Sequence, residues 1–295
     1  MSIVSSGDHE FARRPARGFT IIEVLIVLAV TGALLLAAML LINGRQRNTA
    51  FNQSIRNIQT ELQQIINEVG SGYYPNNGNL SCDRGGPAGG TKLSAGTTEQ
   101  GANVNCVFMS KVAQFAVGTE DPEPYNIYTL VGLRGTTVSP SVDLKTSKAR
   151  VIASGTAAGD AVVPDAFETN LLQYGLSVSK MYYSNAAGSR VADIAAVGFT
   201  MNVSSLGDAD GSQRVEVVAI PGTALHVSKA TGVQQINDRL ATIDSSAAGT
   251  LINPPGGVQI CLNSGGTIQS GLISIGGSDR QGSVDLQIFN TKDCV

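Results

Sequence analysis

The sequence contains no tryptophan, aromatic residues make up 5% of its 295 residues, and only 15% are charged. We therefore expect a core made mainly of aliphatic side chains. The net charge is −3, and no domain-sized basic segment occurs. Nucleic acid is not the expected partner, because proteins that bind it usually carry concentrated positive charge.

Catalytic motifs are also missing. His226 is the only histidine beyond His9, and no Ser–His–Asp set, P-loop or glycine-rich nucleotide motif accompanies it. We expect no enzyme activity and no cofactor. Asp208 and Asp210, in GDADGS, form a calcium candidate because Ca²⁺ prefers clustered oxygen ligands, but the EF-hand pattern is incomplete. Asp-Gly between two strand-like runs equally fits a hairpin turn, which we favour, so no metal site is predicted.

Cysteine is scarce, with four residues. They are Cys82, Cys106, Cys261 and Cys294. Their wide spacing fits two disulfides better than a zinc site, which usually includes a close CxxC pair. Three connectivities are possible, and closeness along the chain favours Cys82–Cys106 and Cys261–Cys294. Disulfides would place this part of the chain outside the reducing cytosol.

A long apolar run lies near the N-terminus. Residues 19–42 read FTIIEVLIVLAVTGALLLAAMLLI, with Glu23 as the only charge. The run is long enough to cross a bilayer as a helix. Three arginines precede it within residues 13–17. By the positive-inside rule, the N-terminus stays cytoplasmic and the chain beyond about residue 45 is exported.

Three ordinary interpretations of this run leave features unexplained. A signal peptide has a shorter apolar core and a small-residue cleavage site after it, whereas INGRQRN follows here. A plain membrane anchor does not account for Glu23, because a carboxylate in hydrocarbon is costly. A twin-arginine export signal fits poorly, because Arg13-Arg14 is followed by Pro15.

The stretch RGFTIIEVLIVLAV resembles the N-terminal signature of type IV prepilins and pseudopilins. In that family a membrane peptidase removes a basic leader that ends in glycine, and the new N-terminus is usually methylated. The resemblance implies cleavage between Gly18 and Phe19 and N-methylation of Phe19. It also implies an assembly role for Glu23, whose carboxylate would pair with the amine of a neighbouring subunit and set its register.

The apolar pattern continues after the run. Apolar residues recur every three or four positions from Phe51 to Val69, and Gly70 provides a stop. We predict one helix over 19–70, about 75 Å long, with a transmembrane segment at 19–42. The apolar stripe of the second half would pack on a globular domain, or else form a coiled-coil seam.

Residues 71–295 are predicted to form an exported β-rich, pilin-like domain. A Gly- and Asn-rich surface loop is expected over 71–103, and a short helix over 232–242. Strand-like runs bounded by Gly, Asn, Asp and Ser occur at 104–109, 112–117, 125–133, 174–183, 192–203, 213–220, 257–263, 268–275 and 283–289. The fold class is therefore α+β, with antiparallel sheets packed on the second half of a long N-terminal helix.

The resemblance implies a structural subunit of a type IV pilus-like filament, which could be a major, minor or tip pilin, with residues 1–18 removed as a leader. The implied partners are prepilin peptidase, copies of the chain and other pilins, the assembly platform in the cytoplasmic membrane, and membrane lipid before assembly. We expect a single-pass protein of the cytoplasmic membrane that later joins a cell-surface filament.

Two alternatives remain. One is a pseudopilin of a type II secretion or competence DNA-uptake system. The other is a membrane-anchored adhesin that never polymerises, which would retain residues 1–18.

Overall fold

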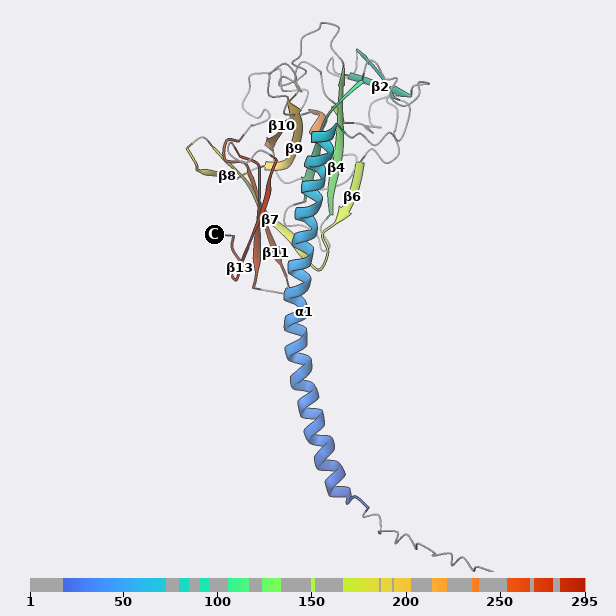
Figure 1. Cartoon of the computed structure of the whole chain (residues 1–295), viewed down its shortest axis with the longest axis vertical. Helices are drawn as coiled ribbons and strands as arrows, with labels where there is room; N and C mark the ends of the chain where they lie inside the picture. The colour runs from blue at the N-terminus through green and yellow to red at the C-terminus, as the bar shows by residue number, and fades with distance from the viewer. Residues whose placement is uncertain are drawn as a thin grey trace, which may run out of the picture. The chain divides into compact units, whose positions relative to one another are not determined.

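The computed structural model describes residues 18–72, 80–84, 91–95, 106–116, 124–133, 150–151, 167–185, 187–192, 194–202, 214–221, 235–238, 254–265, 268–277 and 282–294. Helix α1 (Ile21–Ser71) comes first, and strands follow it (Figure 1). The strands are β1 (Leu80–Arg84), β2 (Thr91–Ala95), β3 (Cys106–Phe115), β4 (Pro124–Leu133), β5 (Arg150–Val151), β6 (Phe167–Leu171), β7 (Leu176–Ser184), β8 (Arg190–Ala192), β9 (Ile194–Asn202), β10 (Arg214–Pro221), β11 (Val258–Ser264), β12 (Ser270–Ile275) and β13 (Val284–Phe289).

The chain divides into two compact units, Met1–Gln46 and Arg47–Val295. The described part of the first unit is the beginning of α1 with three residues before it. Its segment Ile21–Met39 is long and apolar enough to cross a membrane. The hydroxyl of Thr31 donates a hydrogen bond to the carbonyl oxygen of Val27, 2.8 Å away, so this polar group is satisfied within the helix.

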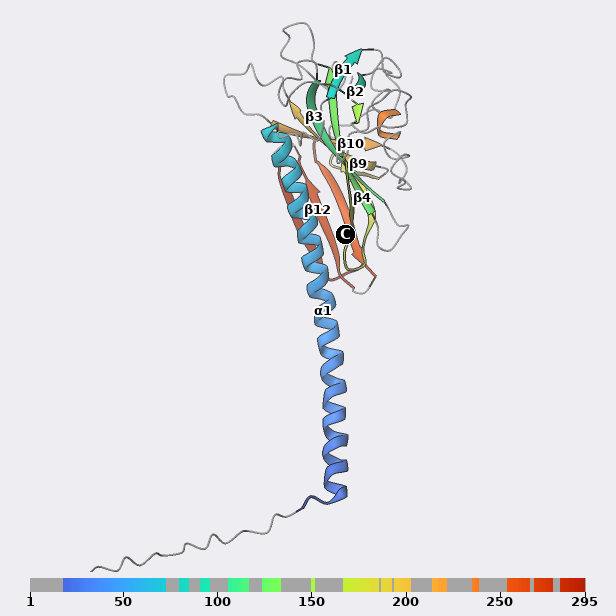
Figure 2. The ribbon, with the colours of Figure 1, turned by 90° about the vertical axis from the view of Figure 1, so that its right-hand side faces the viewer.

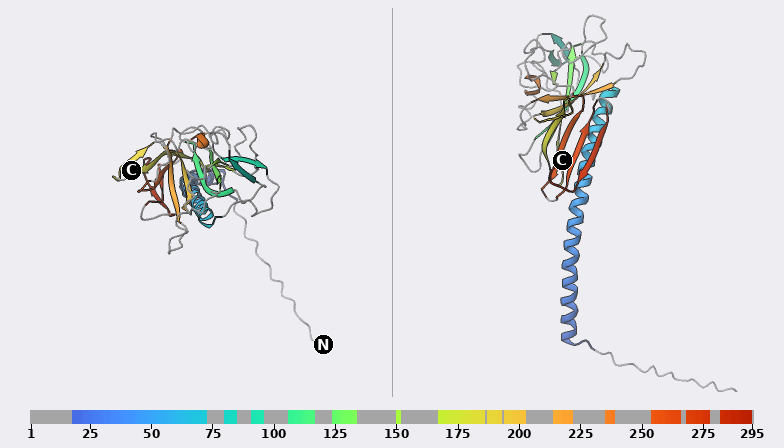
Figure 3. Two further views of the ribbon diagram at one scale, coloured as in Figure 1. Left: turned by 90° about the horizontal axis from the view of Figure 1, so that it is seen from above. Right: turned by 90° about the vertical axis from the view of Figure 1, so that its left-hand side faces the viewer.

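The second unit is built from antiparallel sheets packed against the rest of α1. The strand order is β10-β9-β3-β4-β5 in the first large sheet, where β6 also pairs with β4, and β13-β12-β11-β7-β8 in the second. A small sheet pairs β1 with β2. In Figure 1 the strands of the second sheet lie to the left of this part of α1, and β4 and β6 of the first sheet lie to its right; Figure 3 gives two further views. The predicted α+β class is confirmed.

The apolar stripe of α1 forms the centre of the core. Its members are at most 4% exposed, and they are Phe51, Ile55, Ile58, Leu62, Ile65, Ile66 and Val69. They share one cluster with Phe115 and Ile127 of the first sheet and with Ile260 and Ile273 of the second. Since the chain's own sheets cover the stripe, burial against the domain is the outcome, and a coiled-coil seam is not.

Strand β12 of the second sheet runs beside α1 in Figure 2. A methyl group added to Gly271 would overlap Cδ1 of Ile55. Glycine at this position therefore lets the helix lie directly on the strand.

The prediction of separate strands at 104–109 and 112–117 is wrong, because β3 runs through both. Ser110 and Lys111 are polar and interrupt the apolar pattern between the two predicted runs. Both are buried instead, beside a β-bulge between Phe108 and Ser110. The side chain of Lys111 pairs with Glu68 of α1, which satisfies its charge.

The predicted surface loop over 71–103 is also wrong in part, since β1 and β2 form a hairpin within it. Their sequences, LSCDR and TKLSA, are too polar to show strand periodicity. Short β5, β6 and β8 were not predicted for a similar reason, because edge strands need little apolar content. Of the predicted helix 232–242, residues 235–238 are helical and the others lie outside the described residues.

Candidate functional site

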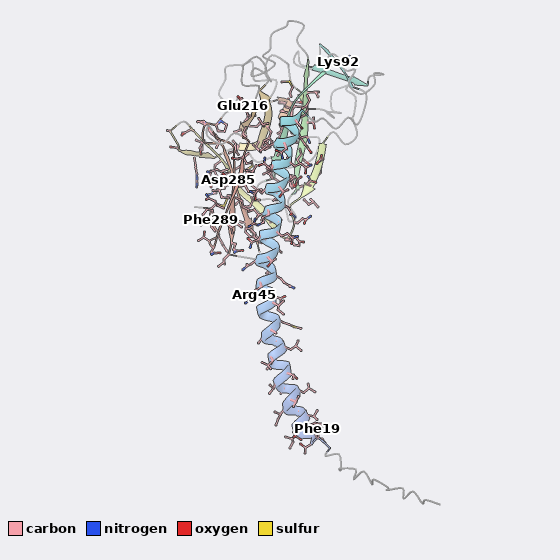
Figure 4. The ribbon with its side chains drawn as sticks, in the orientation of Figure 1. Phe19, Arg45, Lys92, Glu216, Asp285 and Phe289 are labelled. Carbon is pink, nitrogen blue, oxygen red and sulfur yellow. A yellow bond between two sulfur atoms is a disulfide. The ribbon has the colours of Figure 1, made fainter. Side chains whose placement is uncertain are left out.

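The described chain begins with three residues, Gly18–Thr20, that are not helical, and α1 follows at Ile21. Phe19 is 83% exposed and lies at the start of the helix (Figure 4). Apart from Gly18 and its two neighbours in the chain, no heavy atom lies within 4 Å of the place that a Cβ on Gly18 would take. The Gly18–Phe19 peptide bond therefore lies in exposed, non-helical backbone.

Thr20 and Glu23 close the first turn of α1 as a capping box. The backbone N–H of Glu23 donates to Oγ1 of Thr20 at 3.2 Å. In return, the backbone N–H of Thr20 donates to Oε2 of Glu23, also at 3.2 Å. The Thr20 hydroxyl lies 3.3 Å from the same oxygen. Two backbone donors that a helix start leaves unpaired are satisfied in this way.

This arrangement defines what the Glu23 carboxylate can do chemically. It carries a negative charge in the first turn of a helix, where the helix dipole favours anions. It is also exposed, so it could accept hydrogen bonds from another molecule. Sequence reasoning identified Glu23 but missed Thr20 as its partner. The T-x-x-E spacing of the capping box could have revealed this pair.

The other predicted site residues are the four cysteines and the calcium candidates Asp208 and Asp210. Cys261 and Cys294 form a disulfide with a Cα–Cα distance of 5.8 Å, a pairing favoured by the sequence. The side chains of Cys82 and Cys106 lie outside the described residues. The same is true of Asp208, Asp210 and His226. Among the residues that the structure describes, no group of three His, Cys, Asp or Glu could hold a metal ion.

Two carboxylates on the second half of α1 attach it to the first sheet. Glu61 accepts hydrogen bonds from the Tyr125 hydroxyl of β4 and from Asn170 of β6, the latter at 2.6 Å. Burial raises the pKa of Glu61, the Tyr125 hydrogen bond opposes this, and the charge of Glu168 adds to it. Burial and the hydrogen bond to Glu61 also raise the pKa of Tyr125.

Glu68 behaves in the opposite way. Burial alone would raise its pKa, but the hydrogen bonds from Lys111 and Gln64 and the charge of Lys111 outweigh burial and lower it. The two contacts lie about two turns apart on the helix and attach it to the first sheet at two points.

Residues 13–39 match the sequence family described as the prokaryotic N-terminal methylation motif. The chain therefore carries the type IV prepilin-type signature, which belongs to structural pilin-type proteins. The match spans the Gly18–Phe19 bond, the capping box and the apolar segment Ile21–Met39. Together, the motif and this apolar helix suggest membrane anchoring followed by assembly with other subunits. No curated protein and no solved structure matches the chain.

Proposed function

We propose that this chain is the precursor of a subunit of a type IV pilus-like filament. Its leader, residues 1–18, is removed by prepilin peptidase on the cytoplasmic side, and Phe19 is methylated. The single observation that carries the proposal is the methylation motif at residues 13–39. The exposed, non-helical Gly18–Phe19 bond supports it, because a peptidase must bind extended backbone on both sides of the bond that it cuts.

Cleavage would leave a cationic amine on Phe19, four residues before Glu23. In hydrocarbon neither charge is stable alone, so pairing between the amine of one subunit and the carboxylate of its neighbour would lower the cost of burying both. The pairing would set the register between apolar helices. On assembly, the Glu23 carboxylate would either give up its hydrogen bond from the Thr20 N–H or keep it through one oxygen and bind the neighbouring amine through the other.

The test is mass spectrometry of filaments sheared from cells, with measured stoichiometry. We expect a peptide that begins at N-methylated Phe19. An abundant peptide identifies a main filament subunit, and a trace beside a dominant second pilin identifies a minor or tip subunit. A membrane-bound protein that still carries Met1–Gly18 would contradict the proposal and favour the non-polymerising adhesin.

The second candidate is a pseudopilin of a type II secretion or competence DNA-uptake system. The observation behind it is that the same motif is the N-terminal signature of pilins and pseudopilins alike. Filaments that stay within the envelope, and are absent from the sheared fraction while Phe19 is cut and methylated, would favour this candidate.

A further inference from the structure

Two turns meet at one end of the globular unit, beside Ser54 of α1. The first, Leu171–Gly175, joins β6 to β7, and the Ser54 hydroxyl donates to the carbonyl oxygen of Gln173 at 3.0 Å. The second joins β11 to β12, and its Gly265 N–H donates to the carbonyl oxygen of Gly175 at 3.3 Å. We call this end the base of the unit; it lies at the lower end of the sheets in Figure 1.

The exposed large apolar side chains of the unit gather at the base. Among the described residues of Arg47–Val295, four large apolar side chains are exposed: Leu171 (54%), Tyr174 (57%), Ile268 (66%) and Ile288 (36%). Leu171 ends β6, Tyr174 lies in the turn that follows it, and Ile268 lies just before β12. Ile288 pairs with Gly271, on which Ile55 of α1 lies, so it belongs to the same end. Scattered apolar residues need no explanation, but their confinement to one end indicates a contact surface.

The composition and geometry of the base agree with this. Segments 171–175 and 264–270 contain no charged residue, although 15% of the chain is charged. Tyr174 has a φ of 58°, a left-handed conformation that a bulky side chain rarely adopts. Tyr174 and Gly175 (φ 65°) are the central residues of a turn closed by a hydrogen bond from the Leu176 N–H to the carbonyl oxygen of Gln173 at 3.2 Å, and the Tyr174 side chain is exposed in this turn.

The residues between Met39 and Phe51 connect the apolar segment to the globular unit, and their length limits how far the base can lie from a membrane. Eleven residues separate Met39, the end of the apolar segment, from Phe51, the first buried residue of the unit. They span about 18 Å as a helix and at most about 40 Å fully extended. Whatever the arrangement of the two units, a membrane that holds Ile21–Met39 lies within about 40 Å of Phe51, which is one helical turn before Ser54 at the base.

We propose that the base contacts the lipid surface when the subunit is inserted in the membrane and not yet assembled. Tyr174, Leu171 and Ile268 would then lie in the interfacial layer. This rests on the proposed membrane insertion of Ile21–Met39. Tyrosine rings with an apolar body and a polar tip suit the bilayer interface. The exposed Arg45 and Arg47, on the connecting chain, would favour anionic headgroups. Assembly would then require the base to leave the lipid.

The lack of tryptophan makes the test direct, because any single tryptophan becomes a unique fluorescent probe. We would reconstitute the full chain in vesicles with brominated lipids and compare Tyr174→Trp, Ile268→Trp, Tyr182→Trp and Leu28→Trp. Tyr182 lies six residues beyond the start of β7, about 20 Å from the base, and serves as a matched control. Leu28 reports insertion of the apolar helix.

We expect bromine near the headgroups to quench most of the fluorescence of Y174W and I268W and to leave Y182W unchanged, while deep bromine quenches L28W. Replacing Leu171 with Gln in the Y174W background should reduce the quenching. Unquenched Y174W and I268W beside quenched L28W would overturn the lipid contact and leave insertion intact. Unquenched L28W would overturn both. Shielding of Y174W in filaments, without lipid quenching, would show that a second copy covers the base and would also overturn the proposal.

Discussion

At the scale of single residues, Glu23 has two partners that can be separated by experiment. In the structure its carboxylate accepts a hydrogen bond from the Thr20 N–H. In the proposed filament it meets the amine of a neighbouring Phe19. Both partners suit an acceptor at the start of a helix, but only the second requires a charge. Substitutions that remove the charge or the cap alone therefore distinguish the two roles.

Glu23→Gln should keep the cap, because the glutamine oxygen can still accept from Thr20, and should lose the charge pair. We expect normal leader cleavage and a filament yield reduced as strongly as in Glu23→Ala. Thr20→Ala removes the capping hydroxyl, keeps the carboxylate and should preserve most of the yield. Immunoblots of cut and uncut protein and the amount of sheared filament measure both effects. Normal yield in Glu23→Gln would rule out the charge pair.

Gly271 tests how closely α1 must lie on β12. Gly271→Ala should destabilise the globular unit by about 1–3 kcal/mol, because the new methyl group overlaps Ile55. Adding Ile55→Val removes the overlapping Cδ1 and should recover part of this loss. Chemical denaturation of the full chain in detergent gives the free energies. Gly265→Ala is the control, since nothing lies within 4 Å of its added Cβ. Additive effects of the Gly271 and Ile55 changes would contradict the contact.

At the scale of elements, the junction between α1 and the first sheet depends on two carboxylates whose pKa values move in opposite directions. The raised pKa of Glu61 means that the folded state binds its proton more tightly than the unfolded state. The contribution of Glu61 is therefore fully present below its ordinary pKa of 4.5 and is lost as the pH rises through the raised value. The lowered pKa of Glu68 stabilises above 4.5 and is lost as the pH falls through the lowered value.

Glu61→Gln should remove the part of the stability that declines above pH 4.5, so the midpoint of thermal unfolding should fall less with rising pH than in the original chain. Glu68→Gln should act in the opposite direction, weakening the unit at neutral pH and much less in acid. Calorimetry of the full chain in detergent across the range from acid to neutral pH measures both. Parallel pH profiles for the original chain and Glu61→Gln would contradict the proposed proton binding.

At the scale of the whole molecule, the chain end is joined to the second sheet. Cys294 bonds Cys261 of β11, 33 residues away. The Arg190 guanidinium of β8 donates to the carbonyl oxygen of Cys294 at 3.5 Å and lies 6.0 Å from the ring centre of Tyr182. Gln269 donates to the side chain of Asn290 at 3.2 Å. These contacts order a polar C-terminal segment that buries little apolar surface.

Replacing both Cys261 and Cys294 with Ser should lower the free energy of unfolding by roughly 3–4 kcal/mol, because the unfolded chain regains the freedom of the closed loop. We expect faster protease removal of the residues after β13, followed by mass spectrometry. Arg190→Gln, which removes one contact but keeps the disulfide, serves as the control and should leave most of this protection. An unchanged denaturation midpoint in the double variant would show that the other contacts suffice.

Local patterns in the sequence determined much of this protein. The arginines, Gly18 and the apolar run identified the prepilin-type signature, because such a signature is a short continuous stretch of sequence. The three- and four-residue spacing from Phe51 to Val69 identified the buried face of α1, because helical periodicity is local. The T-x-x-E cap is a local pattern of the same kind, although only Glu23 of this pair was identified from the sequence.

Only the tertiary structure decided which elements share the core and where charge is buried. Lys111 looked like a break between strands, and its partner Glu68 lies 43 residues away on α1. Gly271 fell inside the predicted strand 268–275, but no local pattern indicated that Ile55 of α1 would lie on it. The apolar base joins residues of separate turns that no sequence window contains. Long-range contacts of this kind depend on how sheets pack, and packing is a property of the whole unit.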